Sequence, residues 1–259
     1  MRTLLFVLHL EGIRLLGVTN RKGVFFMPSD AITPTQHTRS LYNTKSLVTM
    51  AMLTALAYAV MAVCKVIPPI GGFLSLDLKD TVIAIGGFLY GPLAALLMSV
   101  AVSFLEFLTV SDTGWIGLLM NIIATAGFVC PAVYLYRRKH KTSAAVVGLI
   151  TGIVCLTVLM VLWNYIMTPI FWGMPREAVV DMLVPLIIPF NLVKGILNSA
   201  LIMLLYPPVS TALRKIQLVP AHQSAPGEVK AKFNYVPTVI SAVVLVTGIL
   251  MALAMMGIL

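Results

Sequence analysis

The sequence is dominated by long apolar runs that are separated by short polar connections. Each run approaches the length of about 20 residues that an α-helix needs to cross the hydrocarbon core of a bilayer. Lipid offers no partner to backbone N–H and C=O groups, so a spanning segment must be a helix or part of a closed barrel. The period-two alternation of a membrane barrel is missing. We therefore predict helical spans near residues 46–66, 92–110, 115–136, 143–168, 182–206 and 236–259.

The composition excludes an ordinary soluble domain. Hydrophobic residues make up 59% of the chain, charged residues only 10%, and the mean hydropathy is +0.99. In a soluble protein a net charge of +9 would suggest nucleic-acid binding. Here the basic residues lie in the connections, where they report membrane topology, so we expect the lipid bilayer as a partner and no nucleic acid.

The predicted fold is an all-α membrane protein with a six-helix transmembrane bundle and an additional C-terminal transmembrane helix. One of the six is short, running from Thr81 to the turn at Gly91–Pro92, with Asp80 as its N-cap. We expect Pro207 and Pro208 to end the sixth helix. The predicted domains are an N-terminal extension (1–44), the bundle (45–213), a cytoplasmic linker (214–235) and the seventh helix (236–259).

The N-terminal extension mixes short apolar patches with basic residues and a segment rich in Pro, Thr and Ser. We expect it to be poorly ordered or interfacial, or to reflect a start codon placed too far upstream. Alternate connections in the rest of the chain differ in charge, because one set holds only Lys65, Lys79 and Arg176. By the positive-inside rule the other set is cytoplasmic, and it holds Arg39, Lys45, Arg137, Arg138, Lys139, Lys141, Arg214, Lys215, Lys230 and Lys232.

Asn191, Lys194 and Asn198 recur on one helical face inside an apolar run. A lysine at the centre of a membrane helix costs about 2.5 to 3.5 kcal/mol on insertion scales and usually faces a protein interior or a wet cavity. We expect Lys194 to face a binding pocket. The alternatives are that it snorkels to an interface or pairs with a buried acid, for which Glu106 is a candidate.

A pocket is expected where these residues meet two other polar groups at the outer ends of their helices, Asn164 and Asn121, beneath a Pro- and Gly-rich loop (67–80). Amides offer a donor and an acceptor together, which suits a planar ligand whose edge alternates carbonyl and N–H groups. The asparagines could instead only bridge helices. The other predicted lining residues are Phe73, Trp115, Trp163, Tyr165 and Phe190.

Catalysis has little support in the sequence. There is no metalloprotease, nucleophile-elbow or Walker A motif, and no cysteine or histidine spacing that would hold a metal. We predict no catalytic residues, no cofactor, no metal site and no enzyme activity, so that any pumping draws on a partner or an ion gradient. The alternatives are a membrane enzyme that uses Glu106 and Lys194 as an acid/base pair, and a structural membrane subunit.

Six segments together resemble a known family, the substrate-binding S-components of energy-coupling-factor (ECF) vitamin transporters, and among them the riboflavin-specific members. The resemblance covers roughly residues 43–213. The segments are AMLTALAYA (51–59), LDLKD (76–80), IGGFLYGPLA (85–94), TGWIGLLMN (113–121), NYIMTP (164–169) and PFNLVKG (189–195).

The resemblance implies a six-helix bundle that binds riboflavin at its outer face, with FMN as a second candidate ligand. The residues implied to hold the isoalloxazine ring are Asn164, Asn191 and Lys194, and the first loop, with Phe73, Leu76 and Asp77, is implied to close over it; Asn121 and Trp163 complete the predicted site. The implied partners are the coupling protein EcfT and the ATPases EcfA and EcfA′.

Ala51, Ala55 and Ala59 form a small-xxx-small series on the first span. Such a series lets another membrane helix approach closely. The resemblance implies that this series docks EcfT. An S-component for thiamin, biotin, pantothenate or another vitamin remains an alternative, and residues 1–42 and the seventh span lie outside the six-helix pattern.

Overall fold

The computed structural model describes residues 5–10, 13–19, 25–26, 44–111, 113–139, 141–216, 218 and 235–258. The chain divides into two compact units, Met1–Asn43 and Thr44–Leu259. In the first unit, β1 (Leu5–Leu10) pairs antiparallel with β2 (Ile13–Thr19), and β2 pairs antiparallel with β3 (Phe25–Phe26). The sequence-based description of this segment did not include strands, which its β-branched and aromatic residues favour. The upstream-start interpretation stays a prediction.

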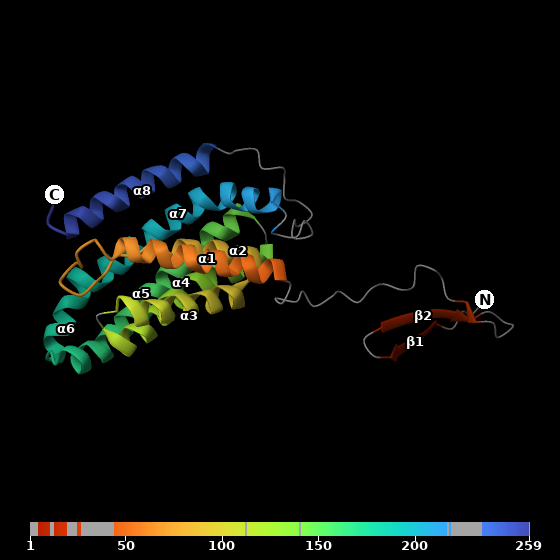
Figure 1. Ribbon diagram of the computed structural model, residues 1–259, viewed down its shortest axis with the longest axis horizontal. Coiled ribbons are helices and arrows are strands. Elements are labelled where there is room, and N and C mark those ends of the chain that lie inside the picture. The colour runs from red at the N-terminus through yellow and green to blue at the C-terminus, as the bar shows by residue number, and fades with distance from the viewer. Residues whose placement is uncertain are drawn as a thin grey trace. The chain divides into compact units, whose positions relative to one another are not determined.

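The second unit is a bundle of helices, and the predicted all-α membrane fold is confirmed for it (Figure 1). Six helical segments among the described residues are long and apolar enough to cross a membrane: α1, α3, α4, α5, α8 and the continuous run from α6 to α7. The helices are α1 (Thr44–Cys64), α2 (Lys79–Tyr90), α3 (Pro92–Thr109), α4 (Gly114–Lys139), α5 (Thr142–Trp172), α6 (Arg176–Met182), α7 (Ile188–Lys215) and α8 (Tyr235–Met255), with a π-helical turn, η1 (Leu183–Ile187), between α6 and α7.

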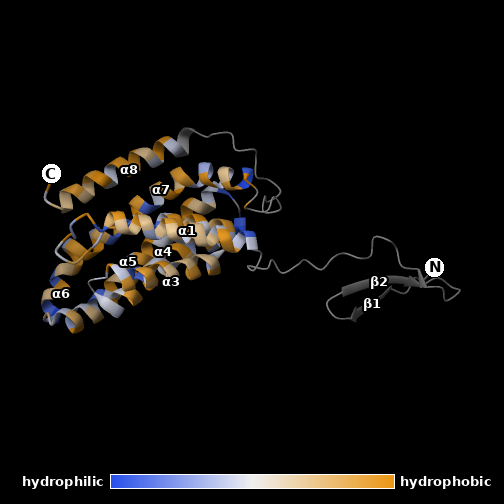
Figure 2. Cartoon of the chain, in the orientation of Figure 1, coloured by the Kyte–Doolittle hydropathy of each residue, from blue (hydrophilic) through white to orange (hydrophobic). Residues whose placement is uncertain are grey.

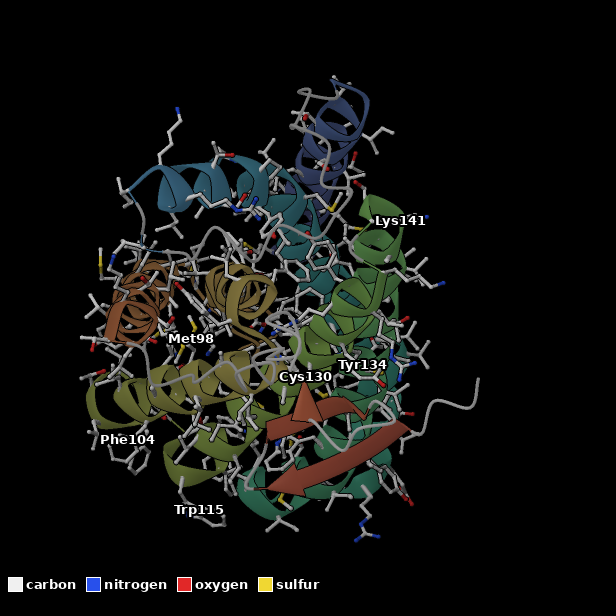
Figure 3. The ribbon with its side chains drawn as sticks, turned by 90° about the vertical axis from the view of Figure 1, so that its right-hand side faces the viewer. Met98, Phe104, Trp115, Cys130, Tyr134 and Lys141 are labelled. Carbon is white, nitrogen blue, oxygen red and sulfur yellow. The ribbon has the colours of Figure 1, made fainter. Side chains whose placement is uncertain are left out.

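Apolar residues predominate along the helices of the bundle (Figure 2), and many of the large ones are exposed on its outside. Phe104 on α3 and Trp115 on α4 lie at the periphery, and Figure 3 shows both directed away from the helices. Only about a third of the most apolar window of α1 is buried. This pattern is expected when lipid replaces water as the surrounding solvent.

The short helix α2 is the centre of the bundle. All of its 12 residues are buried, including Lys79 and Asp80. Gly87 lets its neighbours approach closely, since a Cβ at this position would lie 2.6 Å from Val133 on α4. Asp80 was predicted to cap the helix, and this was wrong. The helix begins at Lys79, Leu78 holds the N-cap position without a side-chain hydrogen bond, and Asp80 lies within the first turn.

The predicted end of the sixth helix was also wrong. Pro207 and Pro208 lie inside α7, which continues to Lys215. Ser210 Oγ and Thr211 Oγ1 donate hydrogen bonds to the carbonyl oxygen of Pro207 at 3.1 and 2.8 Å. The two prolines lack the N–H groups that would bond the carbonyl oxygens of Met203 and Leu204, and membrane helices tolerate such prolines where the surrounding protein supports the backbone.

The two ends of the bundle differ in charge. One end, called the loop end here, carries the connection 65–78, the start of α4 and the end of α5, and in Figure 1 this connection lies on the side of α6. The opposite end, called the basic end, carries the start of α1 and the ends of α4 and α7. Arg137, Arg138, Lys139, Arg214 and Lys215 are located in the last turns of these two helices.

Helices α4 and α5 pack closely along their length. Gly148 and Gly152 form a GxxxG pair on α5, and both face the backbone of α4. A Cβ at Gly148 would lie 2.8 Å from the carbonyl oxygen of Ala132, and one at Gly152 would overlap that of Phe128. Small residues at such a crossing permit backbone contact.

We expect Gly152→Ala to destabilise the protein by about 1 to 3 kcal/mol, because the methyl group meets backbone that cannot move aside. The measurement is thermal unfolding in detergent. Gly127→Ala on α4 is the matched control, because its methyl group would meet only the end of the Leu159 side chain, which can rotate away. Equal unfolding temperatures of both variants would contradict this description of the interface.

Candidate ligand-binding site

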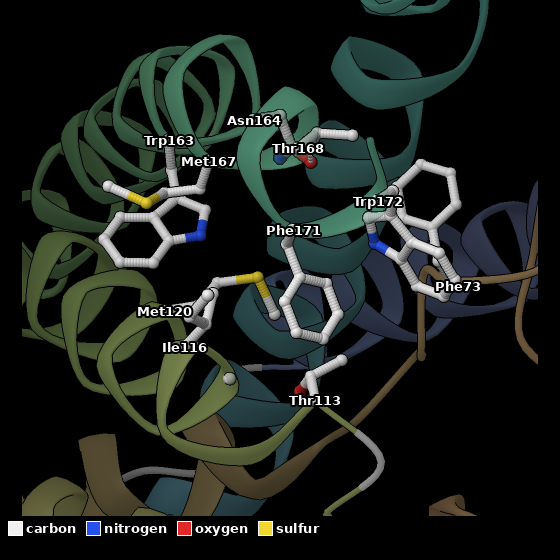
Figure 4. A pocket seen from close by; sticks show the side chains of 11 residues that line it. Phe73, Thr113, Ile116, Met120, Trp163, Asn164, Met167, Thr168, Phe171 and Trp172 are labelled. Atoms are coloured by element: carbon white, nitrogen blue, oxygen red, sulfur yellow. Dashed lines mark hydrogen bonds between the residues drawn. The ribbon is translucent and has the colours of Figure 1, made fainter. Parts of the chain in front are cut away.

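A cleft opens at the loop end between the start of α4 and the end of α5. It encloses about 400 Å³, part of which is open solvent, and its walls are mostly aromatic rings and methionines (Figure 4). The Phe73 ring, from the loop, lies 6.3 Å from the Trp172 ring on α5, centroid to centroid. The lining residues are Phe73, Thr113, Ile116, Gly117, Met120, Trp163, Asn164, Met167, Thr168, Phe171 and Trp172.

Asn164 and Thr168 form a polar strip within this apolar cleft, one turn apart on α5 (Figure 4). Asn164 Nδ2 donates to the carbonyl oxygen of Met160 at 2.7 Å, and its Oδ1 accepts from Thr168 Oγ1 at 3.0 Å. These bonds fix the orientation of the amide. A flat apolar ligand with a hydrogen-bonding edge would match this arrangement.

Three of the predicted site residues, Phe73, Trp163 and Asn164, line the cleft. Trp115 and Tyr165 do not line it; both are largely exposed on the outside of the bundle. The contribution of Met167 and Phe171 was missed. A signal was present, because Trp163, Met167 and Phe171 follow one another at intervals of four residues and therefore share one helical face.

Phe190, which was predicted to line the pocket, is not among the residues that line this cleft. It is buried with Ile70 and Leu74, and Leu76 packs against the same cluster. Asn191 likewise lies outside the cleft lining, and its Nδ2 donates to the carbonyl oxygen of Ile187 at 2.8 Å. Asn191 lies beside the π-helical turn, which the sequence does not reveal. This turn explains why Asn191 lies outside the cleft instead of at its predicted place in the pocket.

Beside the cleft, five charged side chains form a chain of alternating sign. Lys194 Nζ lies 2.9 Å from Asp77 Oδ2, which lies 3.7 Å from Lys79 Nζ. Lys79 Nζ lies 2.7 Å from Glu106 Oε2, and Glu106 Oε1 lies 3.3 Å from Lys65 Nζ. All except Lys65 are buried. Each buried cation therefore has a carboxylate partner, as burial of charge requires.

The predicted pocket-facing role of Lys194 does not match this geometry. Lys194 instead pairs with a buried acid, which was one of the alternatives. This acid is Asp77 on the loop and not Glu106. Glu106 pairs with Lys79 and accepts a hydrogen bond from Asn121 Nδ2 at 3.0 Å. Asn121 thus bridges α4 and α3. Glu106 and Lys194 are each bound to another group, which does not favour the acid/base pair of the enzyme alternative.

Asn198 fastens the start of α2 to α7. Its Oδ1 accepts hydrogen bonds from the backbone N–H and the hydroxyl of Thr81, at 3.0 and 2.8 Å. Its Nδ2 donates to the carbonyl oxygens of Asp77 and Lys194. On the opposite side, Thr125 Oγ1 of α4 donates to Asp80 Oδ1 at 2.6 Å. The first turn of α2 is held from both sides.

Asp77 is the acid that ties the loop to the bundle. Burial alone would raise its pKa, but the ammonium groups of Lys194 and Lys79 and the hydrogen bond from Lys194 bring the pKa below its usual value. Its charge therefore stabilises the fold at neutral pH, and this contribution is lost only as the pH falls through the lowered pKa. Within the described part of the chain, its buried Oδ1 has no hydrogen-bond partner.

Comparison with known proteins identifies the family. A model described as "ECF transporter, substrate-specific component" matches residues 45–206. The chain belongs to this family. The family resemblance seen in the sequence is therefore confirmed, and so is the predicted six-helix fold type. A solved structure described as that of the S component of a bacterial ECF transporter is 30% identical, with a TM-score of 0.56, and covers 65% of this chain and 96% of that one.

Two curated relatives are also similar to this chain. The riboflavin transporter RibU of Staphylococcus aureus is 29% identical over 68% of this chain and 96% of its own length. The riboflavin transporter FmnP of Bacillus subtilis is 27% identical over 62% of this chain and 90% of its own length. Two-thirds of this chain thus corresponds to nearly the whole of the relatives. The family model ends before α8 begins.

We expect Asp77→Asn to destabilise the protein by about 3 to 5 kcal/mol, because Lys194 would remain buried without its acid. Lys194→Met should cost less, since Asp77 would keep Lys79 as a neighbour. The double variant should recover part of the loss. The measurement is denaturant unfolding in mixed micelles. Additive effects of the two substitutions would contradict a direct, energetically coupled pair.

Proposed function

We propose that the chain is the riboflavin-binding subunit of an ECF transporter, with FMN as a second candidate ligand. The observation that carries the proposal is the cleft of aromatic rings and methionines with Asn164 on its wall, in a chain whose curated matches are named riboflavin transporters. The isoalloxazine ring is flat and largely apolar, with carbonyl and N–H groups on one edge. Such a ring would stack among Phe73, Trp163 and Phe171 and direct its polar edge toward Asn164.

The remaining members of the proposed site act around this cleft. Asp77 and Lys194 would hold the loop so that Phe73 and Leu76 lie over the ligand. The unpartnered Oδ1 of Asp77 is an acceptor that a ligand N–H or hydroxyl could reach after a small movement of the loop. Direct contact of Lys194 or Asn191 with the ligand requires a rearrangement of the contacts that they make here, and Asn121 supports the cleft through Glu106.

Transport needs a partner that supplies energy, and we propose EcfT with the ATPases EcfA and EcfA′, as in other ECF transporters. Ala51, Ala55 and Ala59 are exposed along α1, which suits close docking of another membrane helix. The basic end would face the cytoplasm and the cleft would face outward, in line with the positive-inside rule. The chain then binds and delivers its ligand without catalysing a reaction.

An S-component for another vitamin, such as thiamin, biotin or pantothenate, is the second candidate. The cleft disfavours a small charged ligand, because its lining carries no charged side chain. A thermal-shift panel separates the candidates, since a specific ligand at 100 times its dissociation constant adds about 2.7 kcal/mol of stability. Riboflavin should give the largest shift in the panel.

Asn164→Ala should weaken riboflavin binding about ten- to a hundredfold, because one buried hydrogen-bonding partner is lost. Trp172→Leu should weaken it as well, since this ring lines the cleft and packs beside Phe73. The measurement is quenching of flavin fluorescence during titration of the purified protein. Trp115→Leu is the matched control because Trp115 is exposed outside the cleft, and it should bind like the unmodified protein. Unchanged affinity in Asn164→Ala would contradict the assigned site.

Ala55→Trp should abolish co-purification with the coupling protein and leave riboflavin binding intact, because the bulky ring would fill the flat face of α1. Leu56→Trp, at the next exposed position outside the alanine series, serves as the control. The measurement is pull-down of co-expressed EcfT by the tagged chain, with flavin fluorescence recorded on the same sample. Retained assembly in Ala55→Trp would place the docking face elsewhere.

A further inference from the structure

Helix α8 reaches the loop that borders the cleft. It packs along α7, where Ala252 is buried with Val193 and Leu197 (Figure 1). Close packing extends to Gly248, where a Cβ would lie 2.7 Å from Leu197. At its end, Met255 and Met256 pack against the buried cluster of Ile70, Leu74 and Phe190. The end of α8 and the residue after it therefore lie against a cluster to which both the loop and α7 contribute.

The loop residues of this cluster, Ile70 and Leu74, belong to a small hairpin, residues 70–74. Ile70 and Leu74 exchange backbone hydrogen bonds at 2.9 and 3.0 Å, which gives the hairpin a fixed shape. Gly71 adopts φ 63° at its turn and packs against Leu186 of the π-helical turn. Leu186 of the π-helical turn and the methionines at the end of α8, Met255 and Met256, thus pack against the cluster to which the hairpin belongs.

The same hairpin carries the aromatic ring that borders the cleft. Phe73 faces Trp172 on α5 and also lies among the residues that contact the buried cluster beside Met255 and Met256. A displacement of the hairpin from α8 would therefore displace Phe73 from the cleft. Two thioether side chains suit a contact that must release and re-form, because methionine is flexible and adapts to different neighbours.

Helix α8 lies beyond the part of this chain that the family model matches. The family model ends at residue 206, and α8 begins at Tyr235. The matched part of this chain already corresponds to 96% of the S. aureus relative. The inference that a further helix supports the loop therefore rests on the contacts of α8 alone.

We propose that α8 is a built-in clamp, in which Met255 and Met256 are positioning residues that hold the hairpin 70–74, and Phe73 with it, over the cleft. The clamp slows the entry and the exit of a ligand, because the hairpin must leave the methionines before the cleft opens. The identity of the ligand rests on the proposed function, whereas the hold on the hairpin does not.

The test compares Met255→Ala/Met256→Ala with Met251→Ala in the full chain. Met251 is on the same helix but is half exposed on its outer face, so its variant controls for loss of a methionine from α8. The first readout is hydrogen exchange of the backbone amides of Ile70 and Leu74 without ligand. The clamp predicts faster exchange there in the double variant by about tenfold or more, with exchange in α4 and α5 unchanged.

The second readout is the rate of riboflavin release after excess unlabelled competitor is added. The double variant should release the ligand about tenfold faster, with a smaller change in affinity because association also speeds up. Gly248→Phe, which would push α8 away from Leu197, should reproduce both effects by a different route. Absence of riboflavin binding in every variant, with faster exchange at the hairpin, would contradict the proposed ligand and support the clamp.

Exchange at Ile70 and Leu74 that matches Met251→Ala would overturn the clamp. The same holds if exchange rises uniformly over the whole bundle in the double variant, because α8 would then contribute only general stability. A merely structural helix would lower the unfolding temperature without selecting the hairpin.

Discussion

Compensation of buried charge is the constraint on which the loop end of the bundle depends. Three acids and two lysines lie buried where the loop enters α2, in a protein surrounded by lipid. An unpaired charge at such a place would cost several kcal/mol. This cost is offset because positively and negatively charged side chains alternate from Lys194 through Asp77 and Lys79 to Glu106. The loop cannot leave its place without exposing a cation to an apolar interior.

The position of the cleft follows from this arrangement. Asp77 anchors one side of the loop and the hairpin 70–74 packs on α7 and α8 at the other, so Phe73 projects between them toward Trp172. The opposite wall is one face of α5, held against α4 by the close approach at Gly152. A polar network thus supports an apolar cleft. We proposed this cleft as the ligand site because the chain belongs to the substrate-specific components of ECF transporters.

The sequence predicted the helices well because lipid makes their length and apolar character a strict requirement. It also placed Asn164, Trp163 and Phe73 together. The sequence did not predict the contacts between segments that are distant along the chain. The lysine of α7 could have met a ligand, lipid or an acid, and only the fold brings Asp77 within 2.9 Å of it. The proline pair was expected to end the helix, but α7 continues through both prolines to Lys215, which local backbone preference does not predict.

The most direct test of the account is an experimental structure of the full chain purified with riboflavin. The account predicts the ring in the cleft beside Phe73, Trp163 and Asn164, with Asp77 and Lys194 still close enough to neutralise each other. A ring bound outside this cleft, or an empty cleft in a protein that has kept its fold and its loop contacts at saturating riboflavin, would contradict it.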